Sequence, residues 1–171
     1  MSAADVDVAS ALLRAVLGVT FVLHGWNHGF GPGGLAGTTS WFDSIGLRPA
    51  RVHAAVSTWL ELAVGVALLL GLLVPVAAAA GIGIMTTAAV TAHRGNGFFV
   101  FKDGWEYVLV IAVALAALAT LGAGALSLDR ALGLEASGAG LGAAVAAAGV
   151  GGAAAMLAVC WRPPARSSDA G

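Results

Sequence analysis

The chain has 171 residues, of which 59% are hydrophobic and 10% are charged, and its formal net charge at pH 7 is −1. Soluble domains carry about 25% charged residues, so this chain lacks the polar surface of a water-facing globule, and its composition predicts a polytopic membrane protein. The nearly neutral charge argues against a nucleic-acid partner. The single cysteine, Cys160, excludes an intrachain disulfide and a Cys-x-x-Cys redox pair.

The first apolar run, residues 9–28, has two different faces. Polar residues, glycines and one aromatic residue recur at helical spacing along one face: Arg14, Gly18, Phe21, Gly25 and His28. The opposite face is aliphatic: Leu12, Val16, Val19 and Leu23. This periodicity predicts a membrane helix whose glycine-bearing face packs closely against neighbouring helices.

Four further apolar runs predict membrane helices at residues 52–73, 76–93, 105–124 and 138–161. The turn-rich stretch before them, residues 29–49, includes a short interfacial helix at 41–47. The last run is almost all Gly and Ala, so we expect it to need a helix partner, on the flank of the bundle or in another protomer. The predicted fold is all-α: a polytopic four-helix membrane bundle in residues 1–130, an additional transmembrane helix in 131–161 and a disordered polar tail in 162–171.

The basic residues of the loops predict an orientation. Six of them belong to the end of the bundle that also carries the C-terminus: Arg48, Arg51, Arg94, Lys102, Arg162 and Arg166. The opposite end has Arg130, with Arg14 near it. The excess of Lys and Arg on the cytoplasmic side of membrane proteins predicts a multi-pass protein of the cell membrane with a cytoplasmic C-terminus.

Glu61 is the residue around which a site is expected. It follows Arg51 by ten residues in the second run, so it lies roughly 15 Å deep by helix rise. A carboxylate at such a depth costs about 2.5–3.5 kcal/mol and therefore usually faces a protein interior and has a partner. One interpretation is a buried ion pair between Arg14 and Glu61 that fixes the helix register.

The other interpretation is a proton-handling or headgroup-binding pocket. Its candidates are Arg14, His24, Glu61, His93 and Glu106. Antiparallel helices are expected to bring four of them, together with His28, into one half of the membrane, whereas Arg14 sits deeper with a side chain long enough to approach Glu61. As an alternative, His93 and Glu106 are caps at helix ends. We expect His28, beside a glycine loop, and His53, beside Arg51, to be exposed. None of these residues is assigned a catalytic role.

A metal site is not predicted. His24 and His28 are one helical turn apart, which is the spacing of two metal ligands on one helix. However, no Glu follows His24 as in the zinc-protease motif, and further ligands would have to come from other helices.

The order of several short motifs resembles the DoxX family of small integral membrane proteins over about residues 11–130. The motifs are Arg14…Gly18…His24-Gly25, Trp41-Phe42…Gly46-Leu47, Glu61-Leu62…Gly65, His93, Gly104-Trp105-Glu106-Tyr107 and Gly124…Ser127-Leu128-Asp129. The family is commonly a four-helix membrane bundle, so the fifth span is a departure. A Lys often follows the His-Gly pair in the family, whereas this chain has Trp26-Asn27-His28.

The resemblance implies a membrane subunit or anchor of a redox-linked assembly, with a quinone as the candidate ligand. The family takes its name from a quinone-linked sulfur-oxidising system. Some actinobacterial members are described with a superoxide dismutase and a thiosulfate sulfurtransferase in a redox-defence complex. No haem, flavin or iron–sulfur motif is visible here, so the chain is expected to be a non-catalytic subunit of a quinone-linked oxidoreductase at most.

Two other functions stay open at this stage. One is a non-enzymatic scaffold or assembly factor whose interior charges only specify the bundle. The other is a small-solute transporter, which is less favoured because the sequence has neither inverted repeats nor a pair of broken helices. In each case the expected partners are the lipid bilayer and a membrane or peripheral protein, or a second copy of the chain.

Overall fold

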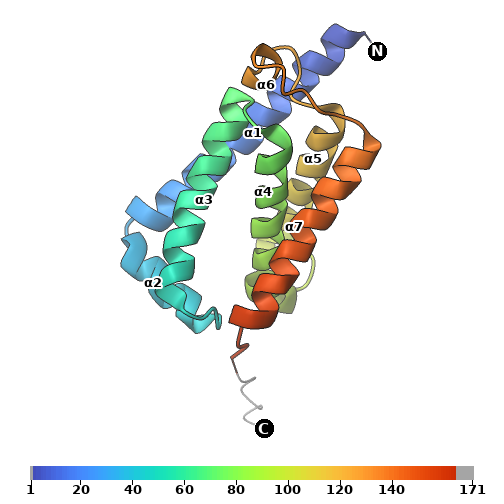
Figure 1. Cartoon of the computed structure of the whole chain (residues 1–171). Helices are drawn as coiled ribbons and strands as arrows, with labels where there is room; N and C mark the ends of the chain where they lie inside the picture. Colours follow the sequence, from blue (N-terminus) through green and yellow to red (C-terminus); the bar gives the residue numbers. More distant parts are fainter. Residues whose placement is uncertain (1, 165–171) are drawn as a thin grey trace.

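The computed structural model describes residues 2–164, and it is a bundle of helices (Figure 1). The five main helices are α1 (Ala3–Phe30), α3 (Ala50–Leu70), α4 (Val74–Ala88), α5 (Glu106–Leu121) and α7 (Ala139–Cys160). The shorter elements are α2 (Gly34–Ser44), a π-helical turn η1 (Ala89–His93), two 3₁₀ turns, η2 (Arg94–Asn96) and η3 (Val100–Lys102), and α6 (Leu128–Ala131). Most of the polar tail predicted at 162–171 lies outside the described residues.

The described part of the chain has four helices that are long and apolar enough to cross a membrane: Ala3–Phe30, Ala50–Leu70, Val74–Asn96 and Ala139–Cys160. The prediction of an all-α, multi-pass membrane fold is confirmed. The fourth predicted span is shorter than expected, because α5 has 16 residues and is about 24 Å long against a hydrocarbon core of about 30 Å. It ends where Gly122 takes a left-handed backbone conformation with φ 89°.

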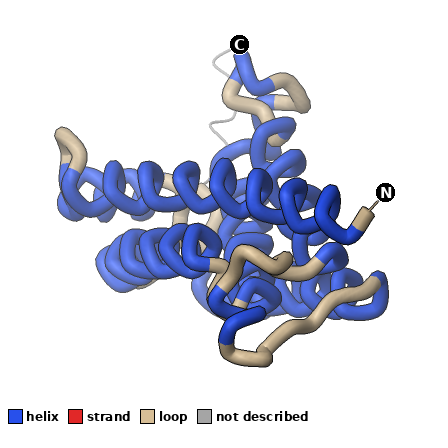
Figure 2. Tube along the Cα trace, turned by 90° about the horizontal axis from the view of Figure 1, so that it is seen from above, coloured by secondary structure: helices blue, strands red, loops and turns tan. Residues whose placement is uncertain are grey.

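The helix α4 is central, because it contacts α3, α5 and α7, while α1 packs on α3 and α5. Seen from above, α1 runs obliquely across one side of the bundle (Figure 2). The two faces predicted for α1 are confirmed. Its buried residues are Ser10, Arg14, Leu17, Gly18, Phe21 and Gly25, and its aliphatic face is exposed at Leu12, Val16, Val19 and Leu23.

The contact between α1 and α3 is made by glycines. A Cβ atom on Gly65 would lie 2.7 Å from the Gly18 carbonyl oxygen, and one on Gly25 would lie 2.8 Å from the Thr58 carbonyl oxygen. The two backbones can approach this closely only where no side chain intervenes. This crossing fixes which residues of α1 meet which residues of α3.

The Gly/Ala-rich helix α7 packs on its own bundle, on the flank formed by α4 and α5. Gly149 lies against Ala79 and Ile82 of α4. Beyond α7, Trp161 forms a β-bridge with Leu47, and its indole N–H donates to the Ile45 carbonyl oxygen at 2.8 Å. The end of α7 is therefore tied to the connection between α2 and α3.

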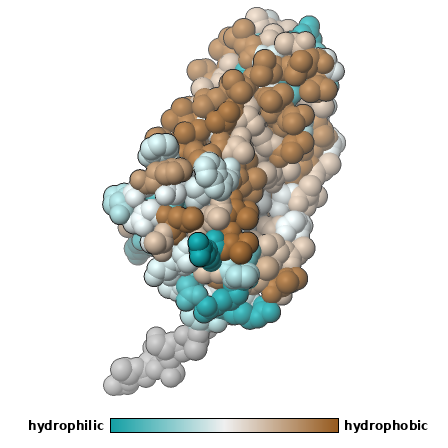
Figure 3. Space-filling view, turned by 60° about the vertical axis from the view of Figure 1, so that its left-hand side comes forward, coloured by the Kyte–Doolittle hydropathy of each residue, from teal (hydrophilic) through white to brown (hydrophobic). Residues whose placement is uncertain are grey.

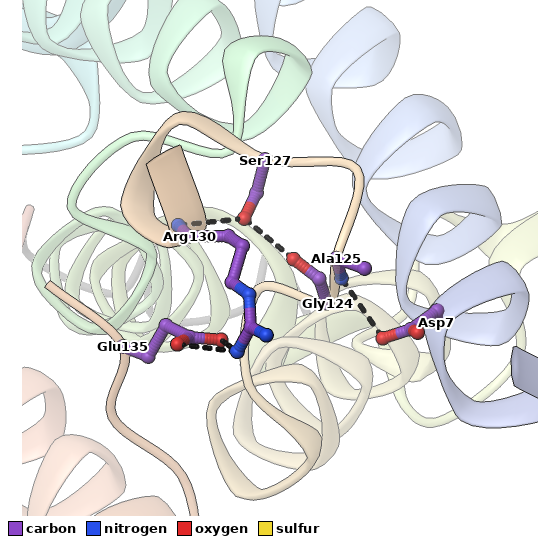
Figure 4. Close-up of polar contacts among 6 residues, drawn as sticks. All are labelled: Asp7, Gly124, Ala125, Ser127, Arg130 and Glu135. Carbon is purple, nitrogen blue, oxygen red and sulfur yellow. Dashed lines mark hydrogen bonds and ion pairs between the residues drawn. The ribbon is translucent and has the colours of Figure 1, made fainter. Parts of the chain in front are cut away.

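The connection from α5 to α7 is fastened at the opposite end of the bundle (Figure 4). The Asp7 carboxylate on α1 accepts a hydrogen bond of 2.8 Å from the Ala125 N–H. Ser127 caps α6 by accepting from the Arg130 N–H. The Arg130 guanidinium donates to Glu135 at 2.7–2.8 Å, and this pairing raises the pKa of Arg130 above its ordinary value.

The outer surface of the bundle suits a lipid environment. Hydrophobic residues cover much of the face in Figure 3, and hydrophilic ones gather mainly toward its lower end. Large apolar side chains on all five main helices are more than half exposed, including Val16, Trp59, Val76, Val113 and Val159. In a water-soluble protein such side chains would be buried in the interior. Their exposure here indicates contact with the bilayer.

Candidate functional site

Glu61 is buried in the middle of α3, with 3% of its surface exposed. The Ser57 hydroxyl, one turn earlier, donates to its Oε1 at 2.7 Å. The His28 Nδ1 atom lies 3.4 Å from the same oxygen. The other oxygen, Oε2, is buried without a hydrogen-bond partner among residues 2–164. A buried oxygen without a partner costs free energy, so Glu61 is suited to accept a hydrogen bond from a ligand group.

His28 is part of this site, and the expectation that it is exposed is wrong. Its side chain is 17% exposed, because α1 continues to Phe30 and keeps His28 on the inner face. The helix α2 then covers the imidazole ring, with Trp41 and Phe42 at centroid distances of 6.0 Å each. The Thr38 hydroxyl fastens α2 to α1 by donating to the His28 carbonyl oxygen at 2.7 Å.

Glu61 faces a cavity of about 570 Å³ between α2, α3, α4 and α7, which we call the lipid-side cavity. His28 and Ser57 lie with it on the polar wall. The opposite wall, from α4 and α7, consists mostly of small residues: Ala79, Ala80, Gly83, Ala148, Gly149, Gly152 and Ala153. Val56 and Val76 also line the cavity and are 53% and 63% exposed, so it reaches the apolar flank of the bundle.

Arg14 lies away from this site, and the expected ion pair with Glu61 is wrong. Its guanidinium donates to the carbonyl oxygens of Leu68 and Leu69, at 3.3 and 3.4 Å, and to that of Leu126. Leu68 is seven residues beyond Glu61, or about 10 Å along α3. The glycine crossing sets this register, and it carries Arg14 past the depth of the acid.

We therefore expect the substitutions Arg14→Met and Glu61→Leu to act independently. Residues without a shared partner and more than about 7–10 Å apart usually have additive effects, within about 0.5 kcal/mol. The measurement is the free energy of unfolding in detergent for both single variants and the double variant. If the double variant loses less stability than the sum of the two single losses, by more than about 1 kcal/mol, the two residues are coupled.

His93 and Glu106 lie beside the connection between α4 and α5. The His93 Nδ1 atom is 2.7 Å from the Asp103 carbonyl oxygen, and Glu106 accepts from the Val100 N–H at 3.0 Å. Neither residue lines the lipid-side cavity. Both residues therefore bind backbone groups of the connection, and whether they act as interfacial caps stays a prediction.

The remaining histidines flank the site. The His24 ring stacks on Tyr107 of α5 at a centroid distance of 6.1 Å, and its Nε2 is 3.4 Å from the Tyr107 hydroxyl. His53 is half-buried rather than exposed and lines the lipid-side cavity, 3.2 Å from the Arg48 carbonyl oxygen. Within residues 2–164, no three His, Cys, Asp or Glu side chains are grouped closely enough to hold a metal ion.

Sequence analysis missed three parts of the site. Ser57 had a usable signal, because a serine four residues before an acid on a helix can reach it. Tyr107 belongs to the Gly104-Trp105-Glu106-Tyr107 motif, but no pattern in the neighbouring sequence indicates that its side chain contacts His24. The wall formed by α7 had no signal, because Gly and Ala side chains do not indicate which surface they pack against.

The fold and the site together define a polytopic α-helical membrane protein with a carboxyl group buried beside a cavity on its lipid-facing flank. A family model described as DoxX matches residues 9–94, half of the chain, and the chain belongs to the DoxX family. The matched part runs from α1 to Arg94 and includes His24, His28 and Glu61, whereas α5 and α7 lie beyond it. No curated protein and no solved structure gives a significant match.

Proposed function

We propose that the protein is a membrane subunit or anchor of a redox-linked assembly and that its lipid-side cavity receives a quinone headgroup. The observation that carries the proposal is Glu61, a buried acid on the wall of an apolar cavity, one of whose oxygens has no partner within the described residues. Ligand sites usually combine apolar walls with a few polar groups, in volumes of about 300–1,000 Å³.

The residues present suit such a ligand. A quinone has carbonyl oxygens that accept hydrogen bonds, and protonated Glu61 or the His28 imidazole can donate them. The small residues of α4 and α7 leave room for an apolar ring and tail, and the exposed edge at Val56 and Val76 offers entry from the bilayer. When bound, a quinone supplies reversible two-electron, two-proton chemistry, in which Glu61 and His28 would hold and orient protons.

The helix α7 supports the proposal because it contributes the outer wall of the lipid-side cavity. Gly149, Gly152 and Ala153 line the cavity from α7. The bridge between Leu47 and Trp161 fixes the end of that helix beside α2. A four-helix member of the family would lack this wall, so the fifth span gives this chain a cavity walled on a further side and open at the edge near Val56 and Val76.

The proposal also covers location and partners. It places the protein in the cell membrane with the end of α7 at the cytoplasmic face. Most described cations outside the membrane helices or at their ends lie there, namely Arg48, Arg51, Arg94, Lys102 and Arg162, against Arg130 at the opposite end. The rest of the assembly is a membrane or peripheral protein, or a second copy of the chain.

Quinone content tests the proposal directly. We expect the protein purified from membranes in mild detergent to yield stoichiometric quinone on lipid extraction. Glu61→Met should reduce this yield by about tenfold, because it leaves a buried quinone oxygen without its donor, at a cost of about 1–3 kcal/mol. The matched control is Glu106→Met, which removes an acid outside the cavity and should retain the quinone. Equal quinone in the wild type and Glu61→Met would contradict the proposal.

A second function, a non-enzymatic scaffold, is favoured by the other buried charges. Arg14 and Asp129 direct the hydrogen bonds of their side chains to backbone groups of the turns around them. Charges used in this way specify the bundle and need no ligand. Co-purification of a stoichiometric protein partner without any quinone would favour this function.

A further inference from the structure

Glu61 borders two spaces rather than one. On the side away from the lipid-side cavity it lines a second, much smaller space, which we call the small pocket. The helices α1, α3, α4 and α5 enclose it, and its lining is Thr20, Phe21, His24, Glu61, Met85, Tyr107 and Ile111. Glu61 is therefore the wall between the two spaces.

The small pocket has the size and polarity of a site for one water molecule. It leaves about 20 Å³ for the centre of a water molecule, and a buried water needs about 10–15 Å³ together with two to four polar partners. Thr20, His24, Glu61 and Tyr107 provide four polar groups around this space. One of them, Glu61, has a buried oxygen, Oε2, with no partner in the described part of the chain.

His24 and Tyr107 connect the small pocket with the membrane surface. Both residues are exposed, and their polar atoms are 3.4 Å apart. His24 lies six residues before the end of α1, or about 9 Å by helix rise, and Tyr107 lies in the first turn of α5. A tyrosine at this level can place its ring in the apolar region and its hydroxyl at the headgroups.

We propose that Glu61 exchanges its proton with the aqueous phase through a water held in the small pocket and through the His24–Tyr107 pair. The inference goes beyond the proposed function, because it holds for whichever molecule occupies the lipid-side cavity. It gives His24 and Tyr107 the role of proton-transfer residues and makes Glu61 the link between water and the cavity.

The transfer needs only acid–base steps. When Glu61 is protonated, its Oε2–H bond breaks and the proton passes to the water. The water gives one of its protons to the Tyr107 hydroxyl while that hydroxyl passes its own proton to the His24 Nε2 atom, 3.4 Å away. The imidazolium then releases a proton to the aqueous phase, and the reverse sequence reprotonates Glu61. No electron is gained or lost.

Few other groups compete for this proton. The titratable residues that line the two spaces with Glu61 are His24 and His28 of α1, His53 of α3 and Tyr107 of α5. The helix α4 faces Glu61 in the small pocket with Met85, which does not titrate. Among the residues lining either space there is no Lys, Arg or Asp. His28 is the nearest of these groups, 3.4 Å from Glu61, but its side chain is only 17% exposed and Trp41 and Phe42 cover its ring. The small pocket leads instead to an acceptor, His24, that is itself exposed.

The test is the rate of hydrogen–deuterium exchange at the Glu61 carboxyl group, followed by infrared spectroscopy on the full chain in detergent. The Glu61 band is the protonated-carboxyl absorption that Glu61→Gln removes, and a pH titration finds where it is present. We expect His24→Phe and Tyr107→Phe to slow its exchange on the order of tenfold or more, as for loss of a proton-transfer group. Thr20→Leu, which fills the small pocket, should slow it similarly.

His53→Phe is the matched control, because it removes an imidazole that lines only the lipid-side cavity and should leave the rate unchanged. Equal melting temperatures identify variants that keep the fold, which the exposed positions of His24 and Tyr107 favour. Wild-type exchange in both His24→Phe and Tyr107→Phe would overturn the proposal. So would slowing by His53→Phe alone, or the absence of a Glu61 carboxyl band at every pH at which the protein stays folded. None of these results depends on quinone binding.

Discussion

Asp129→Ala should lower the free energy of unfolding in detergent by roughly 3–5 kcal/mol, the cost of removing one member of a buried charged network. Asp129 is only 2% exposed. Its two oxygens accept hydrogen bonds from the backbone N–H groups of Leu73, at 2.7 Å, and Val74, at 2.9 Å. These are the first N–H groups of α4, so the carboxylate caps the positive end of that helix dipole.

Arg14 acts on the other side of the same turn. It donates to the carbonyl oxygens of Leu68 and Leu69 at the end of α3, where a cation complements the negative end of the helix dipole. The negative charge of Asp129 attracts the Arg14 guanidinium, and the Asp129 N–H donates to the Gly71 carbonyl oxygen at 2.9 Å. The two side chains thus hold the turn between α3 and α4. The loss of Asp129 leaves a buried cation without this opposite charge and two backbone N–H groups without their acceptor.

Two further variants test whether the loss of stability is specific to the hydrogen bonds of Asp129 or follows from removing any acidic side chain. Asp129→Asn keeps an acceptor oxygen and should lose less stability than Asp129→Ala. Asp43→Ala removes an exposed acid that pairs with Arg48, and surface pairs contribute about 0–1 kcal/mol. If Asp129→Ala is no more harmful than Asp43→Ala, Asp129 does not hold the turn.

The parts of the structure that follow from local pattern could be predicted from the sequence. The positions of the main helices follow from apolar runs, and the buried face of α1 follows from the helical spacing of its glycines and polar residues. The depth of Glu61 also follows, because it depends only on its distance along α3 from the basic loop. In each case, the information lies within about twenty neighbouring residues.

The partners of the buried charges could not be predicted in the same way. Whether Arg14 meets Glu61 or the end of α3 depends on the register between α1 and α3. A shift of two helical turns changes the answer without changing the pattern of either helix. Asp129 lies in the short helix α6, and the N–H groups of α4 that it caps belong to residues more than fifty positions away. The cavity depends on where α7 packs, which its Gly and Ala side chains do not specify.

Gly25→Val should destabilise the protein by about 3 kcal/mol, at the upper end of typical overpacking costs, and should disrupt the site as well. A Cβ atom at this position would lie 2.8 Å from the Thr58 carbonyl oxygen and 2.9 Å from the Leu62 backbone nitrogen. Both neighbours are backbone atoms of α3, so no side-chain rotation relieves the clash and the two helices must separate.

The same separation would move Glu61, whose own Cβ atom would lie 3.0 Å from the added one. We therefore expect Gly25→Val to weaken the contact between Glu61 and His28 and to lower quinone retention along with stability. Gly151→Val is the matched control, because a Cβ atom there meets no atom within 4 Å, and exposed substitutions usually change stability by less than about 0.5 kcal/mol. Unfolding in detergent compares the two variants. If they are equally stable, the close approach of α1 and α3 at Gly25 does not determine the geometry around Glu61.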